Sequence, residues 1–269
     1  MNLSKAIVTT IAAALCLLTA HSMGVAQSTQ MYQQMNASQR GNFVSAKAKE
    51  IGRRIADKDY TFTASFETKI QASLESYLQR LTDVGRTSPL VIIERGKSEA
   101  PTITSAFKQR GVSPLIGLYL PWIESEYVNL PNAKPSGSIG IFQFLPQTGM
   151  RFGLNPEDLL DVAKAADAAA LYIASSSKRF DKQNMKELLA VLAFNRGENN
   201  VERDIAQFVD GTNKDCSVCA LSEPNEADKA ANMETVYYVP RFFAAAILGE
   251  NPQAFGLPSP PLSSFGTRH

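Results

Sequence analysis

Histidine and cysteine are scarce in this sequence, with two and three copies among 269 residues. An excess of one charge sign is also missing, because 27 Lys and Arg face 26 Asp and Glu. A protein with so little net charge lacks the broad positive field that attracts nucleic acid, so we expect no nucleic-acid partner. The composition, 44% hydrophobic and 20% charged, is otherwise that of a globular protein with a substantial core.

The N-terminus has the layout of a secretory signal peptide. A short start with one positive charge, Lys5, precedes an apolar stretch over Ala6–Ala20, and the small residues Gly24–Ala26 follow. We therefore expect export to the periplasm, with residues 1–26 removed and Gln27 as the first residue of the mature chain. A membrane anchor is the alternative, although the apolar stretch is short for a span.

Removal of this segment would leave little for histidine or thiol chemistry. The mature chain would keep Cys216, Cys219 and His269. A Ser/His/Asp or Cys/His relay would then depend on the terminal residue, and two cysteines supply only half of a usual zinc site. A lipid-attachment signal is also lacking, since Leu15 precedes Cys16, so we expect no stable membrane anchor. Carboxylates, hydroxyls and amides are left to carry any chemistry, without a metal or other cofactor.

The hydrophobic pattern is helical nearly throughout, which predicts a mainly α fold. Apolar residues recur at three- and four-residue spacing, and Ser113-Pro114 has the composition of a helix start. The helix that follows it is apolar on nearly every face and should be buried. The expected helices span residues 31–56, 62–84, 115–127, 161–180, 185–195, 200–209 and 233–248. Strand signal is limited to Val91–Ile93, a run that fits a helix equally well.

The sequence shows no internal repeat of the kind that builds solenoids or propellers. Its composition instead predicts three parts after the signal peptide. Residues 27–112 form a helical N-terminal extension, residues 113–250 the main domain, and residues 251–269 a proline-rich tail. A polar segment over residues 210–231 interrupts the helices of the main domain and contains both remaining cysteines.

Glu124 is the candidate for a catalytic acid. It stands near the end of the apolar helix, in the stretch Leu120–Ser125. A carboxyl group that is desolvated by apolar walls keeps its proton to higher pH, as a general acid requires near neutrality. On its own the residue fits a solvent-facing helix end better, so the surrounding motifs decide the interpretation.

Four short segments follow one another in a specific order. They are Glu124-Ser125, the loop Ser136–Gln143, Ala193–Gly197 and Glu234–Val239. Each segment alone is ordinary turn or capping chemistry. Together they resemble the lytic transglycosylases of glycoside hydrolase family 23, which carry Glu-Ser, a Ser/Gly loop ending in Gln, Ala-Tyr-Asn-x-Gly and Glu-Thr-x-x-Tyr-Val. The resemblance covers roughly Ser113–Leu248.

The resemblance implies a lysozyme-like helical domain, as in goose-type lysozymes and soluble lytic transglycosylases. It also implies a lyase that acts on peptidoglycan (murein) in the cell wall, with glycan strands as the partner. The family cleaves the β-1,4 bond between N-acetylmuramic acid and N-acetylglucosamine and leaves 1,6-anhydromuramic acid ends. The sequence most resembles the membrane-bound lytic murein transglycosylase D branch, through its helical extension and the stretch Asn251–Leu257, without the C-terminal peptidoglycan-binding repeats of many members.

The resemblance assigns roles to five residues. Glu124 takes the position of the catalytic acid and base. The positions that bind or order the sugar are Ser125, Gln143, Asn195 and Tyr238. Such a mechanism needs no second carboxylate, because the 2-acetamido group of the substrate can act as an internal nucleophile. Glu126 would be a poor second carboxylate, since two positions along a helix turn it to another face.

Two features depart from the family pattern. Phe194 stands where the family usually has Tyr, which removes a hydroxyl from the cleft wall and leaves a ring that can still pack. The segment with Cys216 and Cys219 lies between the Asn195 and Tyr238 motifs, where we expect the rim of the cleft. In an oxidising compartment a local disulfide is the expected state, with free thiols as the alternative. A redox-active pair would need a strand-to-helix setting that the pattern lacks.

Two other functions stay open on the sequence alone. A lysozyme-like hydrolase could use the same scaffold with water as the attacking group. A non-catalytic glycan-binding envelope protein could keep the cleft, although an intact Glu124 argues against it.

Overall fold

The computed structural model describes residues 30–131, 137–223 and 233–266. The expected signal peptide and His269 lie outside these residues. Within them the chain is helical, and extended residues pair only in an isolated bridge between Ile139 and Phe144. The predicted mainly α fold is confirmed. Across the same residues, no helix is both long and apolar enough to span a membrane.

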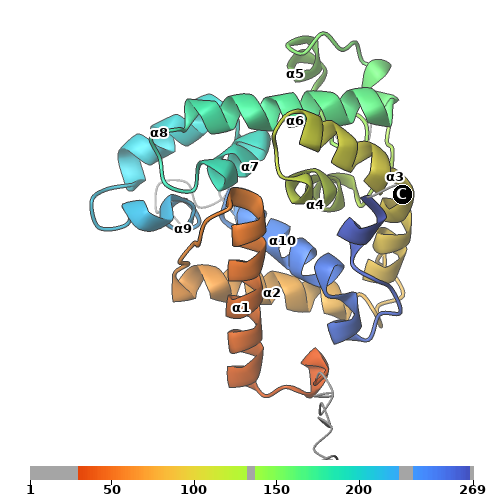
Figure 1. Ribbon diagram of the computed structural model, residues 1–269, viewed down its shortest axis with the longest axis vertical. Coiled ribbons are helices and arrows are strands. Elements are labelled where there is room, and N and C mark those ends of the chain that lie inside the picture. The colour runs from red at the N-terminus through yellow and green to blue at the C-terminus, as the bar shows by residue number, and fades with distance from the viewer. Residues whose placement is uncertain (1–29, 132–136, 224–232, 267–269) are drawn as a thin grey trace, which may run out of the picture. The chain divides into compact units, whose positions relative to one another are not determined.

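The helices follow the chain order shown in Figure 1. The α-helices are α1 (Ala37–Ala56), α2 (Ala64–Gln79), α3 (Pro89–Gln109), α4 (Pro114–Ser125), α5 (Pro146–Met150), α6 (Val162–Arg179), α7 (Lys186–Arg196), α8 (Glu198–Phe208), α9 (Ser217–Leu221) and α10 (Met233–Glu250). Short 3-10 helices are η1 (Tyr32–Gln34), η2 (Asp158–Leu160), η3 (Lys214–Cys216), η5 (Pro252–Phe255) and η6 (Leu262–Gly266).

Helix α3 lies in the expected helical extension, in a stretch for which the sequence pattern gave no helix bounds. Ser88 caps it by accepting a hydrogen bond from the Leu90 N–H, and Pro89 stands in its first turn. The β-branched run Val91–Ile93 lies inside α3, so it forms a helix and not a strand. Two of those three side chains are fully buried, so their packing outweighs the preference of β-branched residues for strands.

Helices α4 and α10 supply much of the core. Every residue of α4 from Leu115 to Trp122 is buried, as its apolar faces predict. Helix α10 packs against α1, α2, α4 and α7, and nearly all of it from Thr235 onward is buried. The end of α4 and the start of α10 are therefore held in place by core packing on several sides.

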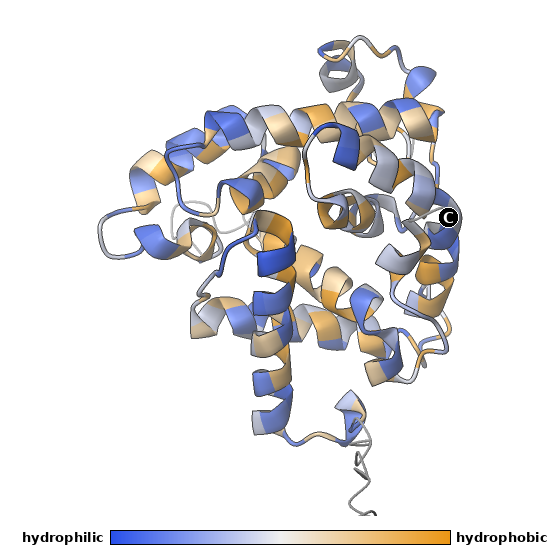
Figure 2. Cartoon of the chain, in the orientation of Figure 1, coloured by the Kyte–Doolittle hydropathy of each residue, from blue (hydrophilic) through white to orange (hydrophobic). Residues whose placement is uncertain are grey.

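The expected N-terminal extension packs on these helices. Phe62 and Phe66 contact Phe243 of α10, with ring centroids 5.1 and 6.1 Å apart. Figure 2 shows hydrophobic and hydrophilic residues alternating along α1, as in a helix with one face on the core. Residues on both sides of position 112 thus share one set of packing contacts.

Glu250, at the end of α10, joins three parts of the chain. Its buried carboxylate accepts hydrogen bonds from the hydroxyls of Tyr119 and Ser263, each at 2.6 Å. It also forms an ion pair with Arg54 at 2.7 Å. A buried charge needs partners of this kind to offset its desolvation. The network connects α1, α4 and the C-terminal helix η6.

Candidate active site

Glu124 is the carboxylate at the C-terminal end of α4. The helix ends one residue later, and Glu126 caps it in the left-handed conformation, with φ 52°. The Glu124 side chain is half-buried and lines a cavity of about 430 Å³. The other lining residues are Ser138, Gln143, Phe144, Leu145, Thr148, Tyr172, Phe194, Asn195 and Glu234. The cavity is within the size range of ligand sites in proteins.

Tyr238 holds the Glu124 carboxyl from α10. Its hydroxyl donates a hydrogen bond to Oε1 of Glu124 at 2.5 Å. Burial, together with the neighbouring charge of Glu124 and the hydrogen bond to it, holds the pKa of Tyr238 well above its usual value of 10.0. Tyr238 therefore stays protonated and acts as the donor. The sequence-predicted pair is brought together across 114 positions of the chain.

The loop that follows Gly137 forms one wall of the cavity. Ile139 and Phe144 close it by pairing their backbones, and Gly140 turns the chain with φ +79°. The Ser138 hydroxyl donates to Oε1 of Gln143 at 2.8 Å, and the Gln143 amide donates to the Gly140 carbonyl at 2.7 Å. Gln143 thus lines the cavity as predicted, and it also fixes the shape of its own loop.

Ser125 ties this loop to the end of α4. It is buried, and its hydroxyl donates a hydrogen bond to the Ile141 carbonyl at 2.7 Å. Neither Ser125 nor Tyr238 is among the residues that line the cavity, whereas Glu124, Gln143 and Asn195 are. The five predicted residues therefore divide into three at the surface of the cavity and two that support it.

Asn195 and Glu234 face each other at the cavity. The Asn195 amide, near the end of α7, donates to Oε1 of Glu234 in the first turn of α10 at 3.4 Å. Glu234 is exposed and gives the cavity a second carboxylate. The sequence interpretation assigned no role to Glu234, although it begins the Glu-Thr motif. The signal was present, but its place beside Asn195 depends on how α7 and α10 pack.

An aromatic wall surrounds Phe194. Its ring centroid lies 5.3 Å from that of Phe144 and 5.3 Å from that of Tyr172. The Tyr172 hydroxyl donates to the Ala193 carbonyl at 2.7 Å, and burial raises the pKa of Tyr172 to about 12. The expectation that the Phe194 ring still packs is confirmed.

Glu126 does not line the Glu124 cavity. It forms an ion pair with Arg80, the residue that follows α2, and it lines a different cavity from the one that holds Glu124. The expectation that Glu126 does not face the Glu124 site is confirmed.

The comparison with known families agrees with this geometry. Residues 101–215 match the family model described as Transglycosylase SLT domain. The domain is a lysozyme-like helical fold of lytic transglycosylases that act on peptidoglycan, and the expected fold class is confirmed. A search of the curated proteins gives no match to the chain.

The SLT match contains Glu124, Ser125, Gln143 and Asn195, and it ends at Asp215. Tyr238 and Glu234 lie beyond its end, on α10. The cavity is therefore completed by a helix that lies outside the matched segment.

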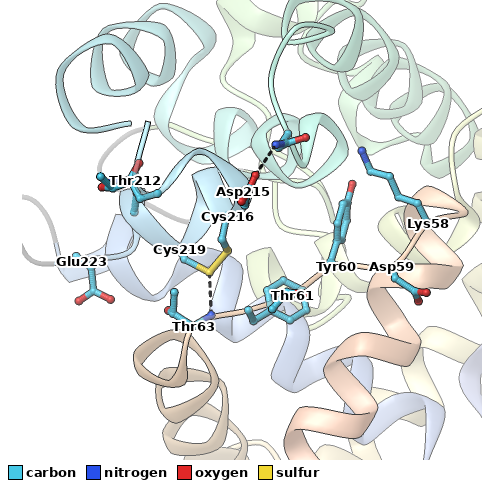
Figure 3. A pocket seen from close by; sticks show the side chains of 14 residues that line it. Lys58, Asp59, Tyr60, Thr61, Thr63, Thr212, Asp215, Cys216, Cys219 and Glu223 are labelled. Carbon is cyan, nitrogen blue, oxygen red and sulfur yellow. Dashed lines mark hydrogen bonds between the residues drawn. A yellow bond between two sulfur atoms is a disulfide. The ribbon is translucent and has the colours of Figure 1, made fainter. Parts of the chain in front are cut away.

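The two cysteines follow the SLT match directly and form a disulfide. The disulfide hypothesis is confirmed over free thiols. The pair lines a separate cavity of about 680 Å³, together with Tyr60 and Thr63 from the chain between α1 and α2 (Figure 3). There the Thr63 N–H donates to Sγ of Cys219 at 3.4 Å. Neither cysteine is among the residues that line the Glu124 cavity, and residues 224–232 of the same segment lie outside the described residues, so the expected position of this segment at the rim of the cleft stays a prediction.

Proposed function

We propose that this protein is a lytic transglycosylase that cleaves the β-1,4 bond between N-acetylmuramic acid and N-acetylglucosamine. The observation that carries the proposal is the Glu124 carboxyl, which lies within the SLT match, lines a cavity and accepts a hydrogen bond from a buried tyrosine. A carboxyl held in one orientation is suited to transfer a proton at a fixed point of a bound sugar.

In the proposed mechanism Glu124 acts twice. It first donates its proton to the glycosidic oxygen of the leaving N-acetylglucosamine, while the 2-acetamido oxygen of muramic acid attacks the anomeric carbon. The resulting carboxylate then removes the proton of the muramic 6-hydroxyl, whose oxygen displaces the acetamido group. The product carries a 1,6-anhydro ring, and Glu124 is again protonated.

The remaining predicted residues support this step. Tyr238 orients the Glu124 carboxyl through its hydroxyl. Gln143 and Asn195 present amide groups at the cavity for the hydroxyl and acetamido groups of the sugar. Ser125 acts indirectly, by fixing the loop that carries Gln143.

A lysozyme-like hydrolase is the second candidate, and Glu234 favours it. A glycosidase that uses water needs a base to activate that water, and Glu234 places a second carboxylate in the same cavity. The mass of the cleaved fragments separates the two reactions, because anhydro products weigh one water less than hydrolytic ones. Digestion of purified sacculi should give anhydro ends, and fragments with only reducing ends would contradict transglycosylation.

The Glu124→Gln variant tests the assignment of the acid. Glutamine keeps the size of the side chain but has no proton to donate, so turnover should fall roughly a hundredfold to ten-thousandfold. Binding of the variant to sacculi should persist. Glu50→Gln, on the exposed surface of α1, is a matched control with unchanged turnover. Unchanged turnover in Glu124→Gln would show that another residue is the acid.

The setting of the enzyme belongs to the same proposal. We place it in the membrane-bound lytic murein transglycosylase D branch, with residues 1–26 as a cleaved signal peptide, 27–112 as an extension, 113–250 as the catalytic domain and 251–269 as a tail. Cell fractionation and N-terminal sequencing of the mature protein test the location. A mature chain that begins at Gln27 in the periplasm is expected, and a cytoplasmic chain that retains Met1 would contradict it.

A further inference from the structure

A second cavity borders the helices that carry Glu124 and Tyr238. It has a volume of about 300 Å³ and is lined by residues of α2, α4 and α10. Its guanidinium, hydroxyl and aromatic groups belong to Ser76, Tyr77, Arg80, Trp122, Tyr237 and Arg241. The combination of guanidinium, hydroxyl and aromatic groups in one cavity is typical of sites that bind anions with an apolar part.

Two guanidinium groups supply donors that the protein itself leaves unused. Nε of Arg80 and Nε of Arg241 are buried and have no hydrogen-bond partner in the described part of the chain. Arg80 also lies over the ring of Tyr77, 4.8 Å from its centroid. Leaving a buried charged donor unpaired is unfavourable, and an anion bound to either guanidinium group would offset part of that cost.

The cavity also carries an unmatched positive charge. Its lining contains one acidic residue, Glu126, and that residue forms an ion pair with Arg80. The charge of Arg241 is therefore not balanced within the lining. Between aromatic walls such a charge attracts an anion more strongly than it would in water.

The position of Arg241 relates the cavity to the proposed active site. On α10 it lies three residues after Tyr238, and its guanidinium is 5.8 Å from the centroid of the Tyr238 ring. On α4, Ile123 lines this cavity while the next residue, Glu124, lines the proposed catalytic one. A ligand bound beside Arg241 would thus be close to a glycan strand bound at Glu124.

We propose that this cavity binds a carboxylate of the peptide substituents on the glycan strand, a proposal that rests on the proposed function. The muramic acid residues of peptidoglycan carry these peptides, so a strand in the catalytic cavity brings a carboxylate to its border. Arg241 binds it by donating two parallel N–H···O hydrogen bonds, and the aromatic walls contact the aliphatic part of the peptide. The protein therefore prefers peptide-bearing strands to bare glycan.

The test compares sacculi with glycan strands from which an amidase has removed the peptides. In Arg241→Gln the ratio of kcat/KM on sacculi to kcat/KM on stripped strands should fall roughly tenfold, because one charged hydrogen-bonding partner is lost. Arg203→Gln, an exposed arginine of α8, is the matched control and should keep the wild-type ratio. An equal loss on both substrates, or no loss on either, would overturn the proposal.

A second variant keeps both arginines and the fold. Ala72→Glu places a carboxylate on an exposed, cavity-lining position of α2, where it competes with the peptide for Arg241, and the same ratio should fall. If neither Ala72→Glu nor Arg241→Gln changed the ratio of kcat/KM on sacculi to kcat/KM on stripped strands, carboxylate binding would be refuted.

Direct binding separates this proposal from the proposed function. By calorimetry, the wild type should bind a free stem tripeptide, and neither the amidated peptide nor Arg241→Gln should show binding. Acetate that binds as tightly as the peptide would mean a general site for small carboxylates and would overturn the proposal. A wild type that cleaves neither substrate but binds the peptide would refute the proposed function alone.

Discussion

At the scale of single residues, the hydrogen bond from Tyr238 to Glu124 is the contact on which the proposed chemistry depends. Tyr238→Phe keeps the buried ring and removes the donor, so the carboxyl loses its fixed orientation. A hydrogen bond to a charged group contributes about 1.5–3 kcal/mol, and kcat should fall roughly ten- to a hundredfold. Steady-state rates of muropeptide release measure the effect.

Tyr60→Phe is the matched control for that variant. Its hydroxyl also donates to a carboxylate, Oε2 of Glu187 at 2.6 Å, and it lies at the cavity shown in Figure 3. It should keep the wild-type rate. If both tyrosine variants lose activity equally, the loss reflects general destabilisation and not the orientation of Glu124.

The same residues show how far sequence reasoning reaches. Glu124 and Tyr238 could be predicted because each belongs to one of the ordered motifs, and the fold brings these two motifs together. Glu234 was not assigned, since its place in the cavity depends on a contact between Asn195 and the start of α10, 39 positions apart. The cavity beside Arg241 could not be predicted, because no local pattern shows which donors lack partners after packing.

At the scale of elements, the loop Ser138–Phe144 depends on one glycine. A Cβ on Gly140 would lie 2.1 Å from the Leu159 carbonyl oxygen, and its φ is +79°. Gly140→Ala should destabilise the fold by about 3 kcal/mol or more, because the clash adds to the backbone strain. Urea denaturation measures the difference.

Gly153→Ala measures the cost of backbone strain without a steric clash. Gly153 has nearly the same φ, +77°, but nothing lies within 4 Å of an added Cβ. This variant should lose only about 1–2 kcal/mol. Equal losses in the two variants would show that contact with η2 does not shape the loop.

Helix α3 shows why the bounds of one element could not be predicted. Its sequence contains Val91–Ile93, Gly96 and Pro101, all of which lower helix propensity. The Ser88-Pro89 start has the same composition as the Ser113-Pro114 start of α4. Burial against α4 and α6 stabilises the helix. These are tertiary contacts, so the local sequence pattern does not show them.

At the scale of the whole molecule, the extension should be required for folding. Removing residues 27–112 eliminates the ring contacts of Phe62 and Phe66 with Phe243. It also eliminates the ion pair between Arg54 and Glu250. Each lost aromatic contributes about 3–5 kcal/mol, against a total stability of about 5–15 kcal/mol. Residues 113–269 alone should therefore show no cooperative unfolding by circular dichroism. A sharp transition like that of residues 27–269 would contradict this expectation.

Buried tyrosines predict how the stability depends on pH. Burial raises the pKa of Tyr77, Tyr119, Tyr127 and Tyr238 above the usual 10.0. Above that pH the unfolded chain loses these protons while the folded chain keeps them, so unfolding becomes more favourable as the pH rises. The urea midpoint should fall between about pH 9 and about pH 11. A constant midpoint would mean that the folded and unfolded pKa values are equal.

The source of the oxygen at the cleaved bond tests the central claim, that Glu124 and the substrate's own groups suffice. The wild type digests purified sacculi in water enriched in the heavy oxygen isotope, and the masses of the fragments are measured by mass spectrometry. The account predicts anhydro ends without label, in the wild type and in Glu234→Gln. Reducing ends that carry the heavy isotope, and that disappear in Glu234→Gln, would show hydrolysis through a second carboxylate and would contradict it.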